Sequence, residues 1–171
     1  MMTNDLHQAY LGKLLANLHT LEFHLRAFFQ NLPGARPLGV AEGTNIYLCP
    51  EGSELPENDF TNYESLGKLI NRYNEWSATR GLLALGKDLV TLRDALAHGR
   101  VACPYRDDDA PFHLIKFSVP RNHRVVVEFN QRMTEQWYTE NIELVQRAWR
   151  SVHETDAAQQ GKSSPSARPR P

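Results

Sequence analysis

The chain has few of the features that mark several classes of protein. It contains only two cysteines, Cys49 and Cys103, and neither lies beside a second cysteine or a histidine at metal-ligand spacing. This pattern argues against a disulfide framework or a zinc site and favours reduced thiols in the cytoplasm. No apolar run approaches the roughly 18 to 20 residues that span a bilayer, and the first residues lack the apolar core of a signal peptide. We therefore expect a cytoplasmic protein without a membrane segment.

An excess of positive charge is also absent. The formal net charge is -1 over 171 residues, so any surface that binds a polyanion must be local. Arginine nonetheless outnumbers lysine by 14 to 5, and a guanidinium offers planar, bidentate contacts to phosphate. The length fits one domain, and no internal repeat is present. We predict a single domain over residues 1–154, followed by a polar, proline-rich tail over 155–171 that is expected to be disordered.

Apolar residues at helical spacing predict four helices, over residues 6–32, 61–77, 82–98 and 133–153. Thr61 and Glu64 have the spacing of a capping box at the start of the second helix, with Tyr63 facing inward. The third helix carries leucines at positions 82, 85, 89, 92 and 96. Gly99 follows it and is expected to stop it in a left-handed conformation.

The remaining segments predict one small sheet and one long loop. Residues 112–119 and 124–130 alternate or are rich in β-branched side chains and are joined by a short turn, which is typical of a β-hairpin. Residues 34–60 form a long connection with an extended stretch over 44–49, and a loop of this length is either functional or ordered against a partner. The predicted fold is therefore mainly α, a four-helix bundle with a β-hairpin inserted between the third and fourth helices.

Three polar side chains gather at the end of the third helix. Arg93 is a cation suited to phosphate, Asp94 is a carboxylate that can orient a neighbour, and His98 is a titratable imidazole. An alternative interpretation is that His98 only caps the helix, because a positive charge is favoured at a helix C-terminus.

Residues 93–98, Arg-Asp-Ala-Leu-Ala-His, match a pattern of Arg, a polar residue, three variable residues and His. In this motif the chain resembles the HEPN superfamily of helical bundles. The resemblance covers residues 89–99 at the level of the motif, and 6–98 with 133–153 at the level of the fold. It implies a metal-independent endoribonuclease of toxin or defence type without a cofactor, or a non-catalytic relative that binds RNA or protein. It also implies RNA as a partner, and an antitoxin protein of nucleotidyltransferase type as a possible one.

The resemblance assigns catalytic roles to Arg93, Asp94 and His98. The RNA 2′-hydroxyl would attack the phosphate, with Arg93 stabilising the developing charge and His98 transferring a proton. Asp94 would orient His98 or Arg93. On an ideal helix a separation of five residues places two side chains about 140° apart, so one straight helix cannot bring both groups to one phosphate. The family solves this by pairing two motifs across a two-fold axis, so we expect a homodimer. The alternative within one chain is that the helix frays at Gly99 and turns His98 toward Arg93.

Further residues are candidates for support or for RNA contact. Glu22 lies within the apolar stripe of the first helix, where a carboxylate needs a partner. That partner is either Arg26, one turn away, or Arg93 across the bundle, and Gly99 supports the motif as its helix stop. The candidate RNA contacts lie before and after the motif helix, although the arginines among them could also be solvated charges at helix ends: Arg80, Arg100, Tyr105 and Arg106.

Overall fold

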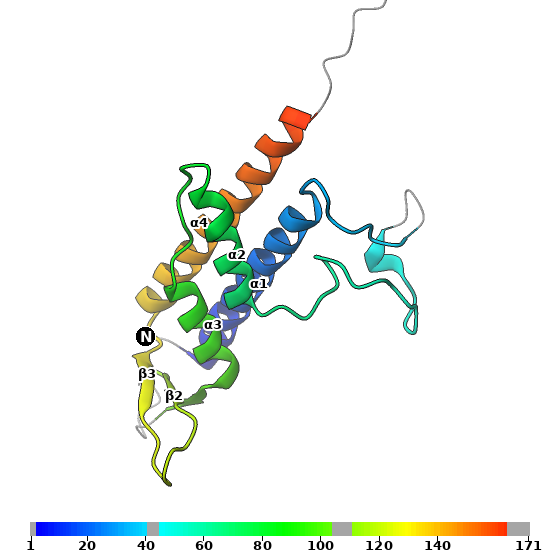
Figure 1. Cartoon of the computed structure of the whole chain (residues 1–171). Coiled ribbons are helices and arrows are strands. Elements are labelled where there is room, and N and C mark those ends of the chain that lie inside the picture. Colours follow the sequence, from blue (N-terminus) through cyan, green and yellow to red (C-terminus); the bar gives the residue numbers. More distant parts are fainter. Residues whose placement is uncertain (1–2, 41–44, 104–110, 164–171) are drawn as a thin grey trace, which may run out of the picture.

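The computed structural model describes residues 3–40, 45–103 and 111–163, and in these residues the fold is mainly helical (Figure 1). A small antiparallel sheet with strand order β1-β2-β3 lies in the chain between the third and fourth helices. The elements are α1 Asn4–Gln30, a 3-10 helix η1 Ile46–Leu48, α2 Leu66–Ala78, α3 Asp88–His98, β1 Arg100–Ala102, β2 His113–Phe117, β3 Val127–Arg132 and α4 Glu135–Ser163. The prediction of a mainly α fold with an inserted β-hairpin is thus confirmed. None of the described helices combines the length and apolarity needed to cross a membrane.

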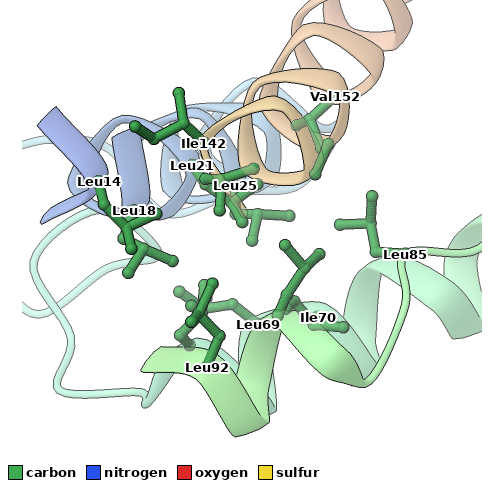
Figure 2. Close-up of a cluster of buried hydrophobic side chains, with 14 of the residues drawn as sticks. Leu14, Leu18, Leu21, Leu25, Leu69, Ile70, Leu85, Leu92, Ile142 and Val152 are labelled. Carbon is green, nitrogen blue, oxygen red and sulfur yellow. The ribbon is translucent and has the colours of Figure 1, made fainter. Parts of the chain in front are cut away.

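The hydrophobic core lies between α1, α4 and the pair α2 and α3. Leucines of α1 recur every three or four residues, so they share one face, and Figure 2 shows this face pointing toward α2, α3 and α4. Leu21 and Leu25 are fully buried, as is Val145 of α4. Burying one such aliphatic side chain stabilises a fold by about 1.5–3 kcal/mol, so the α1 stripe determines how the helices pack.

The start of α2 differs from the predicted capping box. Ser65 is the N-cap residue, and its hydroxyl accepts a hydrogen bond from the Lys68 amide at 3.4 Å. The Thr61 hydroxyl instead accepts from the Asn58 amide at 3.0 Å, within the preceding loop. Tyr63 is fully exposed, so its predicted inward orientation is wrong. Competing side-chain acceptors in the loop therefore move the helix start by several residues.

The motif helix is shorter than the leucine spacing predicted, because α3 begins only at Asp88. Leu83 is exposed in the preceding loop, whereas Leu85 is buried there. Asn74 of α2 holds this loop, since its amide nitrogen donates to the Leu85 carbonyl at 2.9 Å and its oxygen accepts from the Leu85 amide at 2.7 Å. Leu85 thus fills the core as a loop residue and not as part of a helix.

Gly99 has a different role from the predicted one. Its φ of -77° and ψ of 175° are extended, so α3 does not stop in a left-handed conformation. A Cβ atom at this position would lie 2.3 Å from the Ala95 carbonyl oxygen and 2.7 Å from Cδ1 of Leu114. Glycine is needed here because β2 packs closely on the end of α3. The chain turns at once into β1, a strand that the sequence did not predict.

The predicted hairpin is present as β2 and β3. Its tip is a tight turn in which Asn122 and His123 have φ values of 50° and 59°, as a two-residue turn between twisted antiparallel strands requires. The extended stretch predicted over 44–49 is wrong for the residues described, since Ile46–Leu48 forms a short 3-10 helix.

The last helix is longer than predicted, because α4 continues to Ser163 through residues that we expected to be disordered. Contacts with α2 and with the C-terminal end of α1 hold the first of the added residues. The Tyr73 hydroxyl of α2 donates to the Thr155 hydroxyl at 3.2 Å, and the Asn31 side chain donates to Asp156 at 3.0 Å. The prediction of disorder from residue 155 is therefore wrong up to Ser163.

Candidate functional site

A pocket of about 390 Å³ lies between the first turn of α2, the middle of α3 and strands β2 and β3. Arg93 and Asp94 of the predicted motif line it from α3. Lys116 of β2 and Glu128 and Phe129 of β3 line it from the sheet. The inserted sheet therefore contributes directly to the surface around the motif.

Arg93 has no partner within the described part of the chain. Its side chain is half-buried, yet it makes no hydrogen bond or ion pair with any described residue. The other half-buried arginines are paired: Arg26 lies 2.9 Å from Glu22, and Arg72 lies 2.8 Å from Asp59. A partly desolvated charge without a counter-charge is unfavourable. The described part of the chain therefore leaves the Arg93 guanidinium without a counter-charge.

The first turn of α2 adds two further donors to the same pocket. The amides of Leu66 and Gly67 have no acceptor among the described residues, as is usual for the first amides of a helix. Gly67 allows α2 to approach α3 closely, because a Cβ there would lie 3.3 Å from the Val90 side chain. The positive end of the helix dipole favours negative charge, as does Arg93.

Asp94 is held by the sheet. Its Oδ2 accepts a hydrogen bond from Lys116 Nζ at 2.7 Å, and the same ammonium group contacts Glu128. These hydrogen bonds, first with Asp94 and then with Glu128, raise the pKa of Lys116 above its usual value, so the lysine stays charged. Asp94 Oδ1 lies 3.7 Å from His98 Nε2, which is too far for a hydrogen bond. We expected Asp94 to orient His98 or Arg93, but its hydrogen-bond partner is Lys116.

His98 lies on a different surface from Arg93. It is the last residue of α3, its side chain is 64% exposed, and it lines a second pocket together with Arg100, Phe117 and Val125. The separation agrees with the angle of about 140° expected for five residues along a helix. Within one chain, the two groups of the motif do not meet.

Glu22 does not hold Arg93. Its carboxylate pairs with Arg26 one turn away, which is the local alternative, and Arg26 also donates to Asn62 and to the Glu64 carbonyl. Glu22 and Arg93 do line one small cavity of about 190 Å³, but no ion pair joins them. Glu22 therefore supports the junction between α1 and the segment before α2.

The candidate RNA contacts are dispersed. Arg80 lies beyond the end of α2 that is remote from the pocket, with its guanidinium 4.1 Å from the Trp76 ring. Arg100 follows the motif and lies 5.5 Å from the Phe117 ring, beside His98. Tyr105 and Arg106 lie outside the described residues. Arg100 is thus the one described member of this set that lies next to a motif residue.

Lys116 and Glu128 were missed by the sequence analysis. Alternation in the hairpin indicated which residues share a face, but nothing indicated that this face would meet the motif helix. Across residues 3–40, 45–103 and 111–163, no group of three or more His, Cys, Asp or Glu side chains is arranged to hold a metal ion.

No protein-family model, curated protein or solved structure matches this chain significantly. The HEPN resemblance therefore rests on the motif residues, and a function drawn from it is a proposal.

Proposed function

We propose that this chain is a metal-independent endoribonuclease of toxin or defence type, which acts in the cytoplasm as a homodimer of HEPN-like four-helix bundles. The observation that carries the proposal is the half-buried guanidinium of Arg93, which lacks a counter-charge among the described residues and lines a pocket beside two unpaired amides. A phosphate group of RNA has the charge and geometry to satisfy these donors.

In the proposed reaction, the 2′-hydroxyl of one nucleotide loses its proton and its oxygen attacks the adjacent phosphorus. The bond to the 5′-oxygen of the next nucleotide breaks, and that oxygen takes up a proton. The products are a 2′,3′-cyclic phosphate and a 5′-hydroxyl. Arg93 stabilises the negative charge on the phosphorane oxygens, and His98 transfers a proton. Because Arg93 and His98 line separate pockets in one chain, a second copy must bring its own motif to the same phosphate.

One observation favours a second candidate function, a non-catalytic dimer that binds RNA or a protein partner such as an antitoxin. Asp94 is hydrogen-bonded to Lys116, and its 3.7 Å separation from His98 Nε2 is too long for the hydrogen bond that would orient the imidazole for proton transfer. In this alternative the Arg93 pocket still binds phosphate, but the bound RNA is not cut.

Cleavage of RNA by the purified chain separates the two functions. Wild-type protein and His98→Ala are incubated with total RNA in the presence of EDTA, and the new RNA ends are mapped. We expect the wild type to release fragments with 2′,3′-cyclic phosphate ends and His98→Ala to lose at least about a hundredfold in rate. Equal RNA profiles for the two proteins would remove the nuclease proposal.

Arg93→Lys tests the role of the guanidinium. The substitution keeps the charge but removes the planar fork, so we expect most of the activity to be lost. Lys87→Arg, which alters an exposed cation outside the pocket, is the matched control and should keep wild-type activity. Full activity of Arg93→Lys would show that bidentate contact with the phosphate is not needed.

A further inference from the structure

The pocket around Arg93 has two sides of opposite character. The helical side offers hydrogen-bond donors, namely the Arg93 guanidinium and the amides at the start of α2. The sheet side offers the carboxylate of Glu128 together with the side chain of Phe129. Asp94 of α3 and Lys116 of β2 also line the pocket, but these two groups are hydrogen-bonded to each other. A ligand that fills this pocket should therefore be anionic at one end and should donate hydrogen bonds at the other.

Lys116 keeps the Glu128 carboxylate in place without using all of it. The ammonium group contacts Oε2 of Glu128 and Oδ2 of Asp94, and both contacts come from one nitrogen atom. Glu128 Oε1 has no hydrogen-bond partner among the described residues. Glu128 thus presents a positioned acceptor to the pocket, and its charge is only partly compensated.

We propose that the pocket is a subsite for one unpaired nucleotide of RNA, and that Glu128 selects guanine at this position. The inference rests on the proposed function, because it takes Arg93 as the group that holds the nucleotide's phosphate. The volume of about 390 Å³ lies within the range of small-ligand sites, and Phe129 with Val90 forms an apolar wall on which a base can pack.

The chemistry of the base edges favours guanine over the other bases. The Watson–Crick edge of guanine carries two adjacent donors, N1–H and N2–H, so it presents no lone pair toward the free Oε1 of Glu128. Adenine and cytosine each present an amino group beside a ring-nitrogen acceptor. The lone pair of that ring nitrogen would face the carboxylate and repel it. Uracil presents two carbonyl oxygens around a single N–H and is the least compatible. Hydrogen bonds to a charged acceptor are the stronger kind, so the discrimination should be large.

Calorimetry tests the inference. The full chain is titrated with each of the four nucleoside 3′-monophosphates and with inorganic phosphate. We expect the guanosine monophosphate to bind at least about tenfold more tightly than the uridine monophosphate, because one charged hydrogen bond has about this effect. Glu128→Gln should abolish the preference, because the neutral amide is a weaker acceptor than the carboxylate and can also turn its N–H groups toward the base. The affinity for inorganic phosphate should not fall in this variant, because the substitution removes a negative charge from the pocket. Glu75→Gln, which removes an exposed carboxylate of α2 away from the pocket, should keep the preference.

Each result bears on a different part of the argument. Equal affinities for the four nucleotides in the wild type would overturn the inference, as would a guanine preference that survives Glu128→Gln. Arg93→Ala should weaken the binding of all five ligands. If phosphate and nucleotides bind to Arg93→Ala as they do to the wild type, or if the wild type binds none of them, the phosphate site is wrong and base selection is rejected with it.

Discussion

Gly99 offers a quantitative test of how the motif helix meets the sheet. In Gly99→Ala the new Cβ would lie 2.3 Å from the Ala95 carbonyl oxygen and 2.7 Å from Leu114 Cδ1, so the end of α3 or β2 must move. Overpacking of this kind costs about 1–3 kcal/mol. Alanine also restricts the unfolded chain, which offsets about 0.4–1 kcal/mol, and the extended backbone adds no strain. We therefore expect a net loss of up to about 2.5 kcal/mol in the free energy of unfolding.

Urea unfolding followed by tryptophan fluorescence measures this loss, and Gly99→Asn makes the test decisive. If close packing is the reason for glycine, asparagine is larger than alanine and should destabilise more. If Gly99 were a left-handed stop, asparagine would be tolerated better than alanine. Gly12→Ala is the control, since a Cβ there meets no atom within 4 Å and should stabilise α1 by up to about 1 kcal/mol. A Gly99→Asn variant more stable than Gly99→Ala would refute the packing argument.

Three further predictions concern stability. Arg26→Ala should lower the free energy of unfolding by about 2–3 kcal/mol in urea titrations, because its guanidinium joins α1 to the segment around Asn62, and Arg26→Lys should recover only part of it. Burial lowers the pKa of His7, whose Nδ1 is hydrogen-bonded to the Tyr138 hydroxyl at 3.0 Å, so the unfolded chain binds the proton more readily. The stability contributed by neutral His7 is complete above about pH 6.5 and is lost as the pH falls toward the folded pKa. Tm should therefore drop between pH 7.5 and 5.5. A pH-independent Tm would contradict this. Leu25→Ala should cost about 2–5 kcal/mol, whereas Leu83→Ala, at an 87% exposed site, should cost less than about 0.5 kcal/mol, and similar values for the two would be inconsistent with the core described.

Strong periodic patterns predicted the parts of the fold that depend on burial. The leucine stripe of α1 was found because one side chain in three or four of a helix faces the core. The hairpin was found because every second side chain of a strand lies on the same face. The start of α2 was misplaced because Thr61 and Ser65 both resemble N-caps, and only the surrounding loop decides which hydroxyl is used. The extension of α4 was missed because its contacts with Tyr73 and Asn31, at Thr155 and Asp156, are polar and leave no apolar pattern.

The candidate site could be predicted only in part for a related reason. The motif gave Arg93, Asp94 and His98, and helix geometry correctly separated Arg93 from His98. Lys116 and Glu128 come from strands whose register against α3 depends on Gly99 and Leu114, two residues that carry no chemical signal of their own. The hydrogen bond between Asp94 and Lys116 therefore could not be predicted. Long-range pairing between a helix and a sheet is not encoded in any short window of sequence.

A mixing experiment tests the central claim, that two copies combine Arg93 and His98 on one RNA phosphate. Arg93→Ala and His98→Ala are purified separately, shown to be folded dimers, and assayed for RNA cleavage alone and after subunit exchange. Each variant alone should be inactive, and the mixture should regain cleavage, because a mixed dimer pairs an intact guanidinium from one copy with an intact imidazole from the other. A mixture as inactive as its components, or full activity of either variant alone, would contradict the account.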